Sequence, residues 1–243
     1  ASLALVGDLD EDRALALAEL YFRDLGGGLR SLRPWAPKVQ LDTDRNLIMR
    51  DRVELERVYA VWPTVCQFHQ DEPALCLLAD ILASGKSSRL YQELVVAREL
   101  VQDVTVYQSG RELAGAFGAV LTLRPGRDRD TAFAHVERAI ESIARHGVSA
   151  QELERVQTRK VASFIYALDN IGGFGGVADR LNAYNIFLGD PARITSDVER
   201  FQAVTPEQIQ QAAQTYVFHR PKVRLNVLGR GTVEQNEFAH EGR

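Results

Sequence analysis

Residues 58–94 read VYAVWPTVCQFHQDEPALCLLADILASGKSSRLYQEL, and this stretch predicts one strand followed by two helices. Its first five residues, 58–62, form a continuous apolar run, which is typical of a strand covered on both faces. Asp71 can cap the first helix, since aspartate is a preferred N-cap residue. The proline two residues later is tolerated in a first helical turn. Residues 84–86 end that helix, and the second helix is expected over residues 88–99.

The strands expected around this stretch occur as neighbours in the sequence. Val53 and Leu55 alternate with two glutamates just before residue 58, which is the period of a half-buried strand. Further strands are predicted at 102–110, 116–123 and 223–228. Helices are predicted over four further ranges, two of them opened by the capping boxes Ser149-x-x-Glu152 and Thr205-Pro206-x-Gln208: 130–145, 150–169, 177–187 and 206–218.

Neighbouring pairs of strands favour an α+β fold over a doubly wound one. We expect a largely antiparallel or mixed sheet with helices packed on one face. A strand–helix stub should precede it, with a strand over residues 2–8 and a helix over residues 11–25 capped by Asp10. Residues 29–45 contain two prolines and show no period, so they are interpreted as a linker.

Composition and charge exclude several classes of protein. The chain has 243 residues, of which 45% are hydrophobic and 26% are charged, and these values exclude a disordered chain or a collagen-like fibre. A net charge of −4 argues against a nucleic-acid partner. The longest uncharged stretch, 58–70, has 13 residues, whereas a membrane-spanning helix needs about 20. No membrane span is therefore expected.

The residues that most often carry chemistry form no complete site. Cys66 and Cys76 lie in apolar runs and are interpreted as buried hydrophobic residues, with a bridge between them left open. No two of the five histidines lie within five residues of each other, so a helical zinc-peptidase motif is absent. The chain also lacks the G-x-S-x-G motif of a serine nucleophile.

His69 is the histidine nearest to a group of acidic residues, since Asp71 and Glu72 follow it. Pro73 stands where a helical metal motif would continue, so a histidine at a strand end beside a helix cap is the favoured interpretation. An independent enzyme built on these three residues is the weaker alternative. The glycine-rich segment 172–176 lacks a phosphate-binding motif and is interpreted as a hinge or bend, with contact to a bound peptide left open.

Four groups of residues follow one another in an order that covers nearly the whole chain. They are LVGDLD (5–10) with YFRDL (21–25), LADILASGKSSRLYQEL (78–94), GGVADRLN (175–182) with GDP (189–191), and AVTPE (203–207). Each is weak alone, but together they resemble the pitrilysin/insulinase family of zinc metallopeptidases.

The resemblance implies domains that close around a peptide, with zinc held by an H-x-x-E-H motif in a preceding catalytic domain. Residues 1–28 would be the strand–helix end of that domain, residues 29–45 a linker, and residues 46–243 a non-catalytic domain. No metal or other cofactor is then expected in this chain, zinc is expected in the missing catalytic domain, and the chain alone should be inactive.

The non-catalytic domains of such peptidases often assist catalysis through an arginine and a tyrosine in the pattern L-R-x-x-x-x-L-x-Y. Leu94 and Leu100 match this pattern, whereas Val95 and Gln102 stand at the arginine and tyrosine positions. A valine side chain cannot donate a hydrogen bond to a developing oxyanion. The resemblance therefore implies the second domain of a longer protease, and we expect export to a bacterial periplasm.

The role implied for this chain is that of a wall of the substrate chamber. By resemblance, peptide substrate is expected against strand 102–110, at Gln102, Val104 and Val106, and plain sheet structure is the alternative for that strand. The expected partners are the preceding catalytic domain and a second copy of the chain. Either would cover an apolar surface that includes Leu5, Val6, Leu17 and Leu20. A catalytically dead scaffold or core-type subunit of the same family is the alternative function.

Overall fold

The computed structural model describes residues 2–28 and 39–229. The chain divides into two compact units, Ala1–Lys38 with Glu154–Ala203, and Val39–Leu153 with Val204–Arg243. The strands are β1 (Arg45–Asp51), β2 (Arg57–Thr64), β3 (Val101–Gly110), β4 (Gly115–Leu123) and β5 (Val223–Gly229). The helices are α1 (Glu11–Phe22), α2 (Glu72–Ala83), α3 (Arg129–His146), α4 (Ala150–Leu168), α5 (Val177–Leu188), α6 (Asp197–Gln202) and α7 (Pro206–Ala212). Three short turns complete the set, the π-helical η1 (Tyr91–Ala97) and η3 (Ala213–Val217) and the 3₁₀ turn η2 (Pro191–Thr195).

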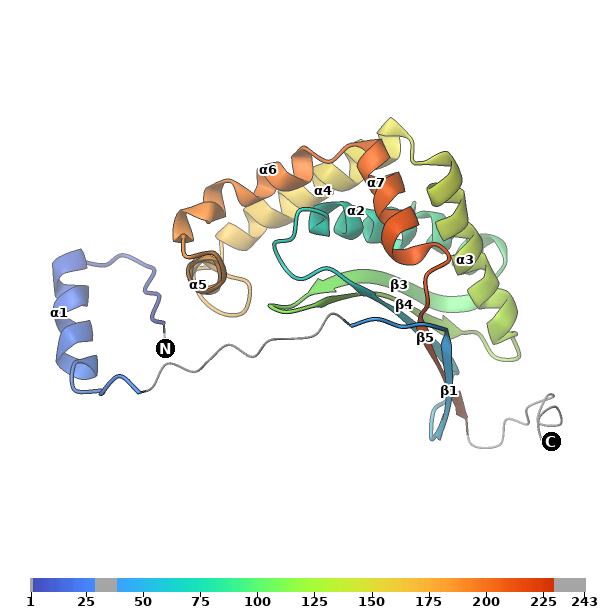
Figure 1. Cartoon of the computed structure of the whole chain (residues 1–243), viewed down its shortest axis with the longest axis horizontal. Coiled ribbons are helices and arrows are strands. Elements are labelled where there is room, and N and C mark those ends of the chain that lie inside the picture. The colour runs from blue at the N-terminus through green and yellow to red at the C-terminus, as the bar shows by residue number, and fades with distance from the viewer. Residues whose placement is uncertain (1, 29–38, 230–243) are drawn as a thin grey trace. The chain divides into compact units, whose positions relative to one another are not determined.

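The second unit contains a five-stranded mixed sheet with the strand order β1-β5-β2-β4-β3. Strands β5, β2, β4 and β3 pair antiparallel in turn, whereas β1 pairs parallel with β5. Helices α2, α3 and α7 lie on one face of this sheet (Figure 1). The expected α+β class, with a mixed sheet and helices on one face, is confirmed.

The core of the second unit lies between the sheet and these helices. On β2, Val58, Ala60 and Trp62 are buried. The indole of Trp62 stacks on the ring of Phe133 from α3, with ring centroids 6.5 Å apart. Tyr59, which points to the opposite face of β2, remains partly exposed. The prediction that both faces of residues 58–62 are covered is therefore wrong, because no described helix of the second unit lies on the second face.

Two of the predicted strands are absent from the described structure. Residues 53–56 form a bend between β1 and β2, and the strand at this position is Arg45–Asp51. The alternation of apolar and acidic residues over 53–56 arises in a loop. In this loop Val53 and Leu55 line a pocket together with residues of the sheet. Residues 2–8 have no strand pairing, and a strand requires the backbone hydrogen bonds of a neighbour.

Some of the predicted helix starts are confirmed by capping hydrogen bonds, whereas the Asp71 side chain makes no such bond at the start of α2, and the helix predicted over 88–99 is largely the π-helical η1. The Asp10 carboxylate accepts a bond of 2.8 Å from the backbone N–H of Arg13. Thr205 and Gln208 form the complete capping box that opens α7. The helix predicted over 206–218 changes to the π-helical turn η3 after Ala212, and α1 ends at Phe22, before the glycines. Short elements α6 and η2 were not predicted.

The first unit contains α1, α5, α6, η2 and most of α4. Within it, the hydroxyl of Tyr184 donates a hydrogen bond of 2.7 Å to Asp197, which links α5 to α6. The glycine-rich segment turns the chain between α4 and α5, and Phe174 at its centre is fully exposed. The predicted bend at 172–176 is confirmed. The linker predicted for 29–45 lies mostly outside the described residues.

Candidate functional site

The helix-free face of the sheet is the surface most suited to contact another molecule, and we call it the open face. It is partly apolar, because its central strands contribute side chains that are only half-buried. The residues of the open face follow from the strand register: Leu47, Met49, Tyr59, Val61, Asp103, Thr105, Tyr107, Val120, Leu225 and Val227.

Tyr107 and Gly118 form a cross-strand pair on the open face. A side-chain carbon at Gly118 would lie 2.3 Å from the Tyr107 ring, so the ring lies directly over the glycine backbone. The aromatic ring covers a position that has no side chain, and 38% of Tyr107 remains exposed. Tyr107 therefore presents an aromatic surface to any ligand on the open face.

A pocket of about 560 Å³ lies at one end of the open face. The bend between β1 and β2 covers part of the sheet there, and apolar side chains from three strands form the lining. Asp51, Glu54 and Arg57 add charge to this lining. Binding sites for small molecules are mostly apolar, with a few polar groups, and the lining of this pocket has the same character. The pocket could therefore hold one apolar side chain of a larger ligand.

Strand β3, for which peptide contact was predicted, is the last strand of the sheet, and β4 is the one described strand with which it pairs. Val101 pairs with Leu123 and Asp103 with Thr122, so Gln102 is the extra residue of a β-bulge and is exposed.

Val104 is 4% exposed and belongs to the core beneath α2, and Val106 is partly buried on the same face. The structure thus separates Gln102 from the two valines. Contact of all three with a peptide stays a prediction.

Val95 and Gln102, at the two positions of the assisting pair, lie on the adjoining elements η1 and β3. Arg124, just after β4, donates hydrogen bonds to the carbonyl oxygens of Val95 at 3.5 Å and Val101 at 3.3 Å. A guanidinium is therefore present beside both positions, but it binds backbone carbonyls and joins η1 to β3. No sequence motif pointed to Arg124, because its role depends on strand pairing.

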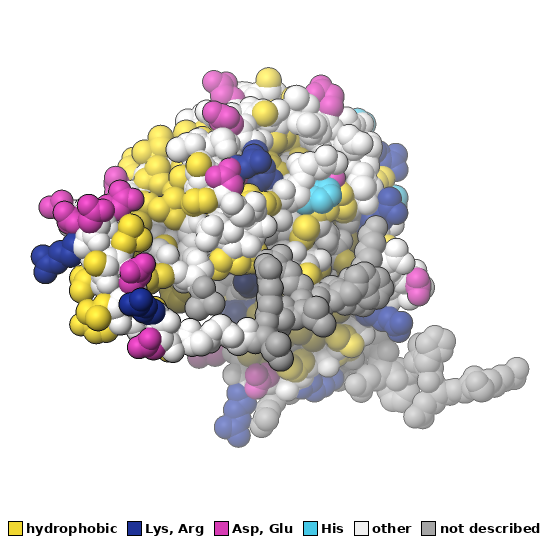
Figure 2. All heavy atoms as spheres, turned by 60° about the vertical axis from the view of Figure 1, so that its left-hand side comes forward, with side chains coloured by type: hydrophobic (Ala, Val, Ile, Leu, Met, Phe, Trp, Pro, Cys, Tyr) yellow, Lys and Arg dark blue, Asp and Glu magenta, His cyan; other side chains and the backbone are white. Residues whose placement is uncertain are grey.

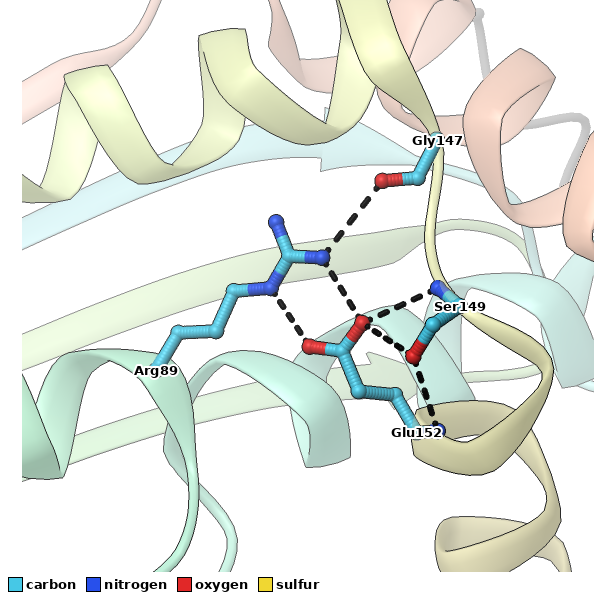
Figure 3. Close-up of polar contacts among 4 residues, drawn as sticks. All are labelled: Arg89, Gly147, Ser149 and Glu152. Atoms are coloured by element: carbon cyan, nitrogen blue, oxygen red, sulfur yellow. Dashed lines mark hydrogen bonds and ion pairs between the residues drawn. The ribbon is translucent and has the colours of Figure 1, made fainter.

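The family-like segment 78–94 has a structural role in this chain. Ser88 is fully buried and its hydroxyl donates a 2.7 Å bond to the carbonyl of Gly85. Leu90 and Leu94 are fully buried as well. Arg89 reaches α4, where its Nε and Nη2 atoms donate bonds of 2.7 and 2.9 Å to the two oxygens of Glu152 (Figure 3).

Glu152 also completes the capping box of α4. Its Oε2 atom accepts hydrogen bonds of 3.0 Å from the backbone N–H and from the hydroxyl of Ser149 (Figure 3). The hydrogen bond from Arg89, above all, lowers the pKa of Glu152 to about 2, and the bonds from Ser149 add to it, although burial opposes both. The carboxylate of Glu152 therefore caps the start of α4 and also binds Arg89, which lies just before η1.

His69, Asp71 and Glu72 lie together but each has a structural partner. His69 Nδ1 accepts a hydrogen bond of 3.1 Å from the backbone N–H of Asp71. Glu72 accepts one of 2.6 Å from the backbone N–H of Phe68, and Asp71 accepts one of 2.7 Å from the hydroxyl of Tyr216. Within residues 2–28 and 39–229, no group of three His, Cys, Asp or Glu side chains could hold a metal ion.

The first 160 residues match the family model described as the peptidase M16 inactive domain. The chain belongs to the peptidase M16 family, as its inactive domain. Its resemblance to pitrilysin- and insulinase-type zinc metallopeptidases is thereby confirmed. This M16 inactive domain is 25% identical to an uncharacterized zinc protease of Streptomyces coelicolor, over 93% of this chain and 49% of that protein.

Solved structures share the fold of this M16 inactive domain. A protease from Helicobacter pylori matches with a TM-score of 0.79 and 20% identity, over 91% of this chain and 53% of the other. The periplasmic protease PqqL from Escherichia coli matches with a TM-score of 0.70 and 18% identity, over 93% and 25% respectively. The chain spans about half the length of the curated relatives it matches.

The relatives of this M16 inactive domain are named zinc proteases, so zinc belongs to the chemistry of the family. Among the helices of the described residues, none is long and apolar enough to cross a membrane.

Proposed function

We propose that this M16 inactive domain forms part of the substrate chamber of a zinc peptidase and supports the domain that bears the zinc. The open face of the sheet carries this proposal, because it offers a broad, half-apolar surface in a chain whose curated relatives are proteases about twice as long. The relatives named as zinc proteases favour a peptidase over a catalytically dead scaffold.

Peptide would contact the domain at strand β3 and at Tyr107. A strand at the edge of a sheet can bind an extended peptide through backbone hydrogen bonds, with side chains of the peptide alternating between its two faces. The burial of Val104 is compatible with this mode, since its backbone would make the contact. Gln102 at the bulge would meet the peptide with its side chain.

The partner we propose is the preceding catalytic domain, with residues 1–28 as its end, residues 29–45 as a linker and residues 46–243 as the inactive domain. In that domain residues 2–8 would find the neighbouring strand that they lack here. Apolar side chains of the first unit support this, because Leu5, Leu17 and Leu20 are exposed by 53%, 43% and 69%. Hydrophobic side chains also gather at the surface in the view of Figure 2. A patch of this kind marks a surface that another protein covers.

Reconstitution with the zinc-bearing domain of the parent protease tests the proposed function. We expect the 243-residue chain alone to leave a fluorogenic peptide uncleaved, and the mixture to cleave it faster than the zinc-bearing domain alone. Thr105→Lys and Tyr107→Lys on the open face should raise KM, whereas Gln151→Lys on the exposed surface of α4 should not. Equal cleavage with and without the chain would refute a supporting role, and an unchanged KM would refute peptide contact.

Export to the periplasm is the location we propose, on the ground that a protein of the same fold is a periplasmic protease. Fractionation of the source cells with an antibody against this chain tests the location, and recovery with cytoplasmic markers would contradict it.

A further inference from the structure

Strand β1 is an edge strand, because among the described residues it has a neighbouring strand on one side alone. It pairs with β5 on one side, and no other described strand lies beyond it (Figure 1). All seven of its residues are exposed, with Leu47, Ile48 and Met49 exposed by 52%, 51% and 45%. An exposed edge strand with three apolar residues at its centre is a ready template for another strand.

The backbone direction of β1 shows which residues would bond to such a strand. The N–H of Arg45 donates a hydrogen bond of 2.8 Å to the carbonyl of Lys222, at the start of the parallel pairing with β5. In a parallel pair, alternate residues direct both backbone groups to the same neighbour, so Arg45, Leu47, Met49 and Asp51 bond to β5. The residues between them, Asn46, Ile48 and Arg50, direct theirs to the free edge.

The sequence of β1, RNLIMRD, is complementary to itself when two copies run antiparallel. With Ile48 opposite Ile48, Arg45 lies opposite Asp51, and Leu47 lies opposite Met49. Arg45 and Asp51 pair twice, once on each side of the two-fold axis. In the registers two residues away, Arg45 would face Met49, or Asp51 would face Leu47, so both Arg45–Asp51 pairs would be lost.

Backbone and side-chain requirements agree in this one register. The residues that direct their backbone groups outward, Asn46, Ile48 and Arg50, form the hydrogen-bonded pairs. Arg45 with Asp51 and Leu47 with Met49 form the non-hydrogen-bonded pairs, where opposed side chains approach most closely. We propose that two copies of this chain associate through β1, antiparallel about Ile48, and join their sheets into one ten-stranded sheet.

Sedimentation velocity of the 243-residue chain over a range of concentrations tests this proposal. We expect a reversible dimer. Arg45→Asp puts two aspartates opposite each other, and Asp51→Arg puts two arginines opposite each other, so each single variant should dimerise about tenfold more weakly. An equimolar mixture of the two variants restores an opposite-charge pair and should form a heterodimer in preference to either homodimer. Arg127→Asp, an exposed charge reversal in the loop before α3, is the matched control and should change nothing.

A second variant tests the backbone of the pairing. Ile48→Pro removes an N–H that is directed to the free edge, so it should abolish the dimer and leave the β1–β5 pairing intact, as monitored by circular dichroism. A chain that stays monomeric at every concentration would overturn the proposal. A dimer that resists both charge variants but is lost in Leu17→Glu/Leu20→Glu would also overturn it, because α1 would then be the interface.

Discussion

The guanidinium of Arg89 and the carboxylate of Glu152 are joined by two hydrogen bonds, although the two residues lie 63 positions apart in the chain. Their side chains are 27% and 26% exposed, so the pair is largely shielded from water. The first residue belongs to a segment that resembles a peptidase signature, and the second opens a helix. The signature at residues 78–94 therefore contributes to packing in this chain through Arg89.

Glu152→Gln should destabilise the second unit by about 2 kcal/mol, because it leaves a part-buried guanidinium without its anion. Chemical denaturation at pH 7 measures this loss. Glu141 pairs with Arg145 within one helical turn at the surface, so Glu141→Gln is the matched control and should cost far less.

The same pair predicts a loss of stability in acid. The pKa of Glu152 is about 2 in the folded protein and about 4.5 unfolded, so its contribution is complete above pH 4.5 and is lost as the pH falls toward 2. Between these values the wild type should lose more stability than Glu152→Gln. If the free energies of unfolding of the two proteins fell in parallel as the pH is lowered, the ion pair would not form in solution.

Tyr216 should ionise later than an ordinary tyrosine. Burial, first, and the hydrogen bond to Asp71 raise its pKa to about 12. Its contribution to stability is therefore complete below pH 10 and is lost as the pH rises toward 12. Absorbance titration of the wild type and of Tyr216→Phe should differ by one phenol that ionises near pH 12, and a difference near pH 10 would contradict the contact.

Gly118→Val should destabilise the sheet by about 2 kcal/mol, because its side chain would displace the ring of Tyr107. The effect should shrink in a Tyr107→Ala background, where the ring is absent. Urea unfolding of the four proteins of this double-mutant cycle measures the coupling. Additive effects would show that the ring lies elsewhere.

Purified chain, dialysed against trace zinc at neutral pH, should retain well below one zinc per molecule. Elemental analysis provides the number. One tightly held zinc per chain would overturn the assignment of zinc to the proposed catalytic domain, and His69→Ala with Glu72→Gln would then be the first variants to make.

Local patterns in the sequence identified most of the helices and the central strands. Caps such as Asp10 and Thr205 are short-range signals, so they could be recognised without the fold. Strand β1 was misplaced because its fully exposed residues show no alternation, whereas the loop at Val53 and Leu55 does. Hydrophobic periodicity in a sequence reflects the burial of one face of an element. An edge strand that is exposed on both faces therefore shows little periodicity.

The candidate site was less predictable than the fold. Val104 and Val106 share one face of β3, as alternation requires, but only the order of the strands shows that this face meets the helices. The bulge at Gln102 and the bonds from Arg124 arise from pairing with β4, and no local pattern encodes them.

The parallel pairing of β1 with β5 has a consequence for the order of synthesis. Asp44 and Lys222, whose side chains join at 2.8 Å beside these strands, are 178 residues apart. On the ribosome, β1 emerges long before its partner β5 exists. We therefore expect β2, β3 and β4 to assemble first and the addition of β5 and β1 to complete folding, since distant pairings form slowly. A nascent chain arrested before residue 223 should expose β1 to chaperones.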